Sequence, residues 1–167
     1  MISLEEIDQV VQSGPFEPTW DSLSHQVCPD WYRDAKFGIF IHWGVYSVPA
    51  FGSEWYSRNM YIQGNPCYDY HREHFGDQVS FGYKDLIPLF AADRFDPASW
   101  LDIFQKAGAQ YLFPVAEHHD GFQMYASCLS SYNSLEMGPR RDVLGELRAE
   151  AEKRGLHFCT SSHRAEH

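Results

Sequence analysis

The sequence predicts an α/β fold that forms the opening part of a TIM-like (β/α)8 barrel, with roughly three strand–helix units. Short apolar runs typical of buried strands alternate with amphipathic helical segments. Such alternation implies parallel strands joined by right-handed helical crossovers. A closed barrel takes about 250 residues, so this chain of 167 residues supplies only its first part, and we expect the chain to be truncated.

The first expected element is a short amphipathic helix that ends before Gly14-Pro15. Ser3 and Glu6 have the spacing of a capping box, in which each side chain bonds a backbone N–H at the helix start. The apolar residues of this helix fall on one face: Leu4, Ile7, Val10 and Val11. We interpret the chain as one domain, with this helix and a loop in residues 1–29 and the strand–helix units in residues 30–167.

The first strand is predicted at residues 37–41, after a loop over residues 16–29 and a brief helical turn over residues 31–36. From residue 44 to residue 96 neither the helical nor the strand period is clean, because Gly, Pro, Asn and aromatic residues interrupt each short helical stretch. So long a connection inside a compact domain is usually functional, or contains small helices that cover a site.

Two helix–strand units follow this connection. Asp96 is a helix cap followed by proline, and it opens a helix that leads into a strand at residues 111–115. Asp142 opens a second helix, which leads into a strand at residues 156–159, and a glycine ends each helix. The apolar residues lie on one face of each helix: Trp100, Ile103, Phe104 and Ala107 in the first, and Val143, Leu144, Leu147 and Ala151 in the second.

The net charge of -10 argues against nucleic acid or an anionic membrane as a partner, since both need a basic face. A neutral or small polar ligand fits this charge better. The cysteines are scattered without zinc-type spacing: Cys28, Cys67, Cys128 and Cys159. The amino terminus has no basic segment followed by an apolar stretch, and no run is long enough to span a membrane, so we expect a cytoplasmic protein.

Each predicted strand runs directly into a polar segment that contains histidine. These segments are His42-Trp43-Gly44, Glu117-His118-His119-Asp120-Gly121-Phe122 and Ser161-Ser162-His163-Arg164. In parallel α/β folds, ligands bind at the carboxyl ends of the strands. We therefore expect the three polar segments to contribute to one shared site.

One interpretation of this site is a metal centre with His42, His118 and His119 as ligands. Adjacent residues on an extended strand point to opposite faces, so His118 and His119 cannot both bind one ion unless the strand has already turned. The first strand also offers no second ligand near His42. We therefore predict no bound metal.

The other interpretation is a sugar site. Sugar hydroxyls both donate and accept hydrogen bonds, and a large aromatic ring covers the apolar side of a sugar. Glu54-Trp55 supplies a carboxylate and an indole on a loop that follows the first strand. Three other features favour structural roles: Glu117 is expected to orient a histidine, Asp120-Gly121 to form a tight turn, and Arg140-Arg141 to be a solvated helix entry.

Taken together, these segments resemble a known family. The strings DAKFGIFIHWGVYSVPAFGSEWY, FDPASWLDIFQKAGAQYLFPVAEHHDGF and RDVLGELRAEAEKRGLHF are similar, in the same order, to the amino-terminal half of the α-L-fucosidases of glycoside hydrolase family 29. The resemblance runs from about residue 30 to the end of the chain. It implies a (β/α)8-like catalytic barrel that cleaves terminal α-L-fucose from glycoconjugates with retention, through a covalent fucosyl-enzyme and without a metal or organic cofactor.

The resemblance also implies which residues bind the sugar ring: His42, Glu54, Trp55, His118 and His119. It places the nucleophilic aspartate at the tip of the next strand and the acid/base carboxylate further on, so both are expected beyond His167 and this chain is expected to be inactive alone. The third polar segment is closer to a subset of the family without the tyrosine-rich tip of other members. No role is therefore assigned to His163 or Glu166.

Two alternatives stay open. One is a metal-dependent TIM-barrel hydrolase that uses His42, His118 and His119, and the other is a non-catalytic sugar-binding remnant. Oligomeric state, fucose linkage and aglycone preference do not follow from the sequence.

Overall fold

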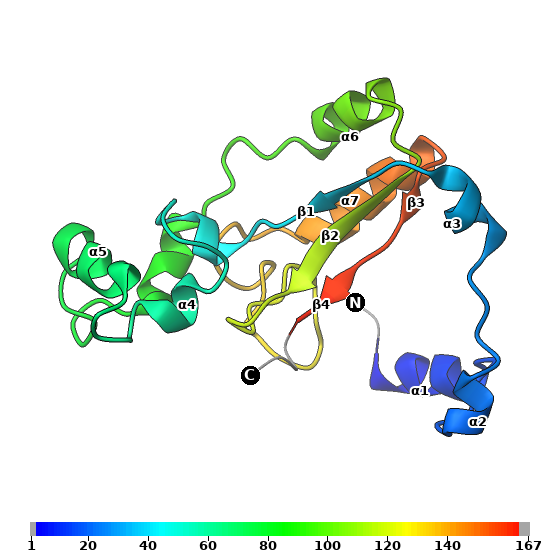
Figure 1. Ribbon diagram of the computed structural model, residues 1–167, viewed down its shortest axis with the longest axis horizontal. Helices are drawn as coiled ribbons and strands as arrows, with labels where there is room; N and C mark the ends of the chain where they lie inside the picture. Colours follow the sequence, from blue (N-terminus) through cyan, green and yellow to red (C-terminus); the bar gives the residue numbers. More distant parts are fainter. Residues whose placement is uncertain (1–2, 164–167) are drawn as a thin grey trace.

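The computed structural model describes residues 3–163 and shows a mixed α/β fold around a small parallel sheet (Figure 1). The sheet has the order β1-β2-β3, in which β1 is Gly38–Ile41, β2 is Tyr111–Glu117 and β3 is His157–Phe158. A short strand β4, Ser161–Ser162, pairs with the far end of β2. All these pairings are parallel, which confirms the alternation predicted from the sequence.

The third strand differs from its prediction at residues 156–159. β3 is shorter than predicted, and part of the expected polar tip forms β4 instead. The reason is that β2 extends to Glu117 and offers backbone partners beyond its predicted end, so that Ser161 aligns with Val115 and Ser162 aligns with Glu117. The polar segment therefore begins while the chain is still in the sheet.

The two predicted crossover helices are present as α6, Pro97–Lys106, and α7, Val143–Lys153. The Asp96 side chain accepts a hydrogen bond from the backbone N–H of Ser99 at 3.1 Å. The Asp142 side chain accepts one from the backbone N–H of Gly145 at 3.0 Å. Both predicted helix caps are therefore confirmed, since each satisfies a backbone donor that the helix itself leaves unpaired.

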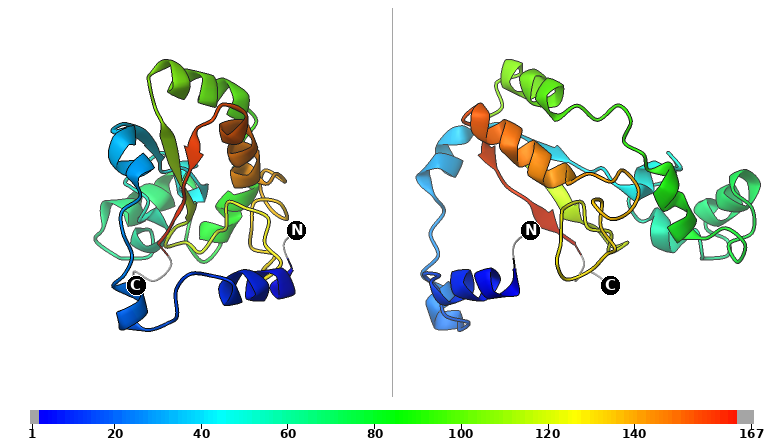
Figure 2. Two further views of the ribbon diagram at one scale, coloured as in Figure 1. Left: turned by 90° about the vertical axis from the view of Figure 1, so that its right-hand side faces the viewer. Right: turned by 180° about the vertical axis from the view of Figure 1, so that it is seen from behind.

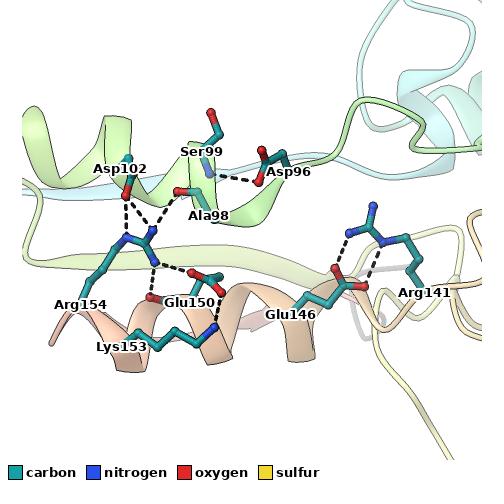
Figure 3. Close-up of polar contacts among 9 residues, drawn as sticks. All are labelled: Asp96, Ala98, Ser99, Asp102, Arg141, Glu146, Glu150, Lys153 and Arg154. Atoms are coloured by element: carbon teal, nitrogen blue, oxygen red, sulfur yellow. Dashed lines mark hydrogen bonds and ion pairs between the residues drawn. The ribbon is translucent and has the colours of Figure 1, made fainter.

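Arg154 ties the end of α7 to α6, as Figure 3 shows. Its Nη2 donates to Oδ1 of Asp102 at 2.7 Å and to the carbonyl oxygen of Ala98 at 3.2 Å. Its Nη1 also donates to the carbonyl oxygen of Glu150, within α7, at 3.0 Å. The fork-shaped guanidinium thus joins side chains and backbone of both helices, which fixes how they lie beside each other.

Arg141 corrects the expectation of a solvated helix entry at Arg140-Arg141. Its guanidinium pairs with Glu146 (Figure 3), donates to the carbonyl oxygen of Phe95 at 2.9 Å and lies 4.7 Å from the centre of the Phe95 ring. A basic side chain at this point stabilises the fold because it satisfies a carbonyl and packs on an aromatic face.

The amino-terminal segment begins away from the sheet (Figures 1 and 2) and ends beside it, where the Trp31 ring stacks on His157 of β3. It contains α1, Leu4–Gln12, which begins with the predicted capping box of Ser3 and Glu6, and α3, Asp30–Ala35, which corresponds to the predicted turn. The segment expected to be a loop also holds a short helix α2, Trp20–Leu23, which Thr19 caps. None of the residues of α1 is buried. Within residues 3–163, no helix combines the length and the apolar character needed to cross a bilayer.

The long connection between β1 and α6 contains the small helices expected there. They are η1, Val45–Ser47; α4, Tyr56–Asn59; α5, Pro66–His74; and η2, Tyr83–Leu89. Figure 1 shows α4 and α5 beyond the carboxyl end of β1, outside the strand–helix units. This part of the chain lies next to the strand ends that carry the polar segments.

The two faces of the sheet have different environments. Leu112 of β2 is fully buried in the core together with Leu101 of α6 and Leu147 of α7. Side chains alternate between faces along a strand, so Phe40 of β1 and its neighbour Phe113 lie on the other face. Phe40 is 51% exposed, and its ring centre lies 5.3 Å from that of Phe113. An apolar sheet face is therefore open to solvent.

We predict that the isolated 167-residue polypeptide self-associates through this face and the neighbouring strand edges, because open apolar faces and unpaired edges promote aggregation. Phe40→Glu should reduce the association measured by light scattering and sedimentation, whereas Val79→Glu, at a residue that is 95% exposed, should leave it unchanged. A wild-type polypeptide that is monomeric, soluble and cooperatively folded would contradict this prediction.

Candidate functional site

The carboxyl ends of the strands bring three imidazole rings together. His42 follows β1, His118 follows β2 and His163 follows β4. The ring centre of His118 lies 5.4 Å from that of His42 and 4.5 Å from that of His163. The predicted meeting of the polar segments at one end of the sheet is therefore observed.

A tight turn carries His118 and His119 away from the strand. The backbone N–H of Gly121 donates to the carbonyl oxygen of His118 at 3.0 Å, and Gly121 has a φ of 67°, which glycine adopts without strain. The Asp120 carboxylate accepts from the backbone N–H of Phe122 at 3.0 Å and from the Tyr83 hydroxyl at 2.7 Å. The tight turn predicted at Asp120-Gly121 is present, and a tyrosine from η2 holds it.

This turn changes the expected relation between the adjacent histidines. Adjacent residues point to opposite faces only on an extended strand, and β2 ends at Glu117, before both histidines. The rings of His118 and His119 lie edge to face with their centres 4.2 Å apart. The two side chains therefore lie in contact, with their ring planes nearly perpendicular.

Trp55 joins the loop after β1 to this turn. Its ring stacks on His119, with ring centres 3.7 Å apart and an angle of 28° between the planes. Glu54 is half-buried, and its negative charge acts on both His118 and Tyr46. The structure thus brings together the residues that the sequence singled out: His42, Glu54, Trp55, His118 and His119.

His118 is held neutral. Burial is the largest of the effects that lower its pKa from 6.5 to about 4; the neighbouring imidazoles of His119, His163 and His42 act in the same direction, and Glu54 opposes them. The backbone N–H of His119 donates to Nδ1 of His118 at 2.9 Å. A neutral ring that accepts at Nδ1 carries its proton on Nε2, so His118 offers a hydrogen-bond donor to a ligand.

In the structure, the three histidines that could bind one metal ion differ from the three predicted from the sequence. Potential ligand atoms of His42, His118 and His163 all lie within 4.8 Å of one another, so the group includes His163 in place of the predicted His119. The strand turns before His119, whose ring instead stacks on Trp55. A metal-bound histidine donates its second N–H to an acceptor, whereas the second nitrogen of His118 already accepts from a backbone donor. This donor set disfavours a metal ion.

Three neighbours of the site have no role predicted from the sequence: His163, Tyr46 and Tyr83. The Tyr46 ring centre lies 5.3 Å from that of His118, and Tyr83 holds the turn through Asp120. The position of His163 after an expected strand indicates that it belongs to the site. No such signal exists for the two tyrosines, because they lie in the connection without a regular period. Glu166 lies outside the described residues.

Comparison with known proteins gives a direct assignment. A profile of the family described as Alpha-L-fucosidase matches residues 3–167. The chain belongs to this family. It is 42% identical over 145 residues to the tissue alpha-L-fucosidase of Rattus norvegicus, covering 86% of this chain and 31% of that protein. It is 43% identical over 141 residues to the plasma alpha-L-fucosidase of Homo sapiens, covering 83% and 30%.

Solved structures of fucosidases share the arrangement of this chain. The alpha-fucosidase of Thermotoga maritima in complex with a mechanism-based inhibitor matches with a TM-score of 0.82 at 37% identity, covering 88% of this chain and 37% of that one. The same enzyme in complex with fucose matches with a TM-score of 0.79 at 37% identity, covering 88% and 37%. This fucosidase-family chain therefore spans about a third of the length of its relatives.

We predict that His118 titrates with a midpoint near pH 4, because its environment favours the neutral ring. The unfolded chain binds this proton at a higher pH, near 6.5, so protonation favours unfolding. The contribution of His118 to the free energy of unfolding should be fully present above pH 6.5, fall as the pH drops toward 4, and level off below. Histidine NMR titration gives the midpoint, and denaturant unfolding at several pH values gives the stability. A midpoint near 6.5 would contradict the prediction.

We also predict that the purified protein carries no stoichiometric metal, because His118 presents N–H rather than a lone pair at Nε2. Elemental analysis after dialysis against zinc should find well below one ion per chain, and the value should be the same in His118→Ala and in the exposed-site control His74→Ala. One zinc per chain that is lost only in His118→Ala would restore the metal-dependent hydrolase.

Proposed function

We propose that this chain recognises a terminal α-L-fucose residue as the amino-terminal part of a retaining α-L-fucosidase. The observation that carries the proposal is the stack of Trp55 on His119 beside the neutral donor His118. It places an aromatic surface next to polar groups at the carboxyl ends of parallel strands. The fucose-bound structure of the Thermotoga maritima relative supports the choice of sugar.

The polar groups of the site suit a neutral sugar. Each hydroxyl of a sugar accepts and donates, so its site needs both kinds of partner. Nε2 of His118 and the indole N–H of Trp55 are donors, and the Glu54 carboxylate is an acceptor. With a net charge of -10, the chain has no general attraction for anionic ligands. A fucosylated glycan, which carries neutral fucose at its end, is the ligand class that fits.

Cleavage with retention needs two further groups. Retaining glycosidases use two carboxyl groups about 5 Å apart, one as nucleophile and one as acid and base. We propose that both lie in the part of the enzyme outside these 167 residues, as the resemblance implies, and that the residues described above bind and orient the sugar. Glu117 is buried and Glu54 is placed to bind, so neither takes a catalytic role in this proposal. No metal or organic cofactor takes part.

We predict that the 167-residue polypeptide does not hydrolyse an aryl α-L-fucoside, because binding groups do not replace covalent and acid/base catalysis. Completing it with the remaining barrel strands of a family member should restore turnover. The assay is release of the aryl alcohol by each polypeptide at matched concentration. Robust activity of the 167-residue polypeptide would show that its own carboxylates catalyse, and a completed but inactive enzyme that still binds fucose would favour the non-catalytic alternative.

In the completed enzyme, His119→Ala should lower kcat/KM by about ten- to a hundredfold, or roughly 1 to 3 kcal/mol, because it removes both a polar contact to the sugar and the support for Trp55. Activity should stay measurable, since the reacting carboxyl groups are untouched. His25→Ala, at an exposed histidine in the amino-terminal segment, serves as control and should leave kcat/KM unchanged. A completed enzyme that tolerates His119→Ala without loss contradicts the proposed role.

A further inference from the structure

We propose that α5 is the platform that fixes the loop of residues 49–56, and that His71 is the positioning residue through which it aligns Trp55. α5 lies outside the strand–helix alternation (Figure 1), and the two ring nitrogens of His71 bond to Tyr56 and to the carbonyl oxygen of Phe81. The importance of His71 for fucose binding rests on the proposed function. The effect of His71 on the Trp55–His119 stack is independent of that function.

One face of α5 is turned toward the loop. Cys67, Tyr70 and His71 follow the spacing of a single helical face, and each contacts a different part of the loop. The Tyr70 hydroxyl donates to the carbonyl oxygen of Pro49 at 3.0 Å. The Tyr70 ring stacks on Phe51, with ring centres 4.0 Å apart and planes 3° from parallel. The first half of the loop is therefore held by one tyrosine.

Gly52 allows the loop to approach α5 closely. Its φ of 72° is one that side chains rarely adopt, and a Cβ at this position would lie 2.7 Å from Sγ of Cys67. Cys67 is itself buried. Glycine is therefore needed here both for its positive φ and for the close approach to Cys67. A larger residue would push the loop away from the helix.

His71 fixes the second half of the loop. Its Nε2 lies 2.8 Å from the carbonyl oxygen of Phe81, which only accepts, so the proton of the neutral ring is on Nε2. Its Nδ1 is then the acceptor for the Tyr56 hydroxyl at 3.0 Å. Tyr56 and His71 are both fully buried. Neither group has water as a substitute partner, so the direction of both hydrogen bonds is set by the fold.

Tyr56 passes this constraint to the sugar site. It follows Trp55 directly, and the two form the start of α4, where the backbone N–H of Asn59 donates to the carbonyl oxygen of Trp55 at 2.9 Å. The Tyr56 side chain reaches back to α5, while the Trp55 ring stacks on His119. Loss of the hydrogen bond between Tyr56 and His71 should therefore loosen Trp55, whose indole ring stacks on His119.

The test follows the Trp55–His119 stack itself. A ring stacked on an indole has ring protons shifted upfield, so the proton NMR signals of the His119 ring report the contact directly. In the protein that carries this sequence, His71→Leu and the more conservative Tyr56→Phe should each remove most of that upfield shift. His71→Gln, which keeps both a donor and an acceptor, should restore part of it. His25→Leu, the same kind of change at an exposed histidine, should leave it unchanged.

Affinity for free L-fucose provides the second measurement. Loss of one neutral buried hydrogen bond should weaken binding by about two- to twelvefold in Tyr56→Phe. If the His119 signals move but neither wild type nor variant binds L-fucose, the positioning role stands and the proposed function fails. If both variants only lower the unfolding temperature and leave the His119 signals in place, His71 is merely structural and the inference is overturned. Should His71→Leu not fold, Tyr56→Phe decides.

Discussion

The contact between Trp55 and His119 is the interaction on which the rest of the site depends. It joins the tight turn at the end of β2 to the loop that precedes α4. An aromatic pair contributes only about 0.5 to 1.5 kcal/mol beyond the area it buries. So weak a contact has a defined geometry only when other interactions fix both partners. The structure provides one such interaction, called an anchor here, for each partner.

The two anchors use the same chemistry. Behind His119, the Tyr83 hydroxyl donates to the Asp120 carboxylate that closes the turn. Behind Trp55, the Tyr56 hydroxyl donates to His71. In each case the hydroxyl of a tyrosine in one segment donates a hydrogen bond to another segment, and this bond is buried for Tyr56 and partly buried for Tyr83. Burial raises the pKa of the Asp120 carboxyl, which is the cost of holding a charged group there, and the two hydrogen bonds it accepts offset that cost.

The neutral state of His118 within an acidic chain is a consequence of the same packing. The imidazoles lie close enough together that adding a proton to His118 would place a buried charge among other rings, so the ring stays neutral and presents Nε2–H. Neutral donors next to an aromatic ring suit a ligand rich in hydroxyl groups. They do not suit an anion, for which charged donors are stronger, or a metal ion, which needs unprotonated nitrogen.

The sequence by itself determined the local features. Ser3, Asp96 and Asp142 signalled the helix starts, and the histidines after each apolar run signalled where the site lies, because these depend on residues near one another in the chain. Only the tertiary structure decided how far β2 extends, that β4 pairs beside it, and that His163 stands with His42 and His118. The platform formed by α5 was likewise invisible, since the contact from His71 to Tyr56 links segments whose spacing has no period. Contacts between distant segments follow from packing and from the need to pair every buried polar group. Local sequence patterns indicate neither of these.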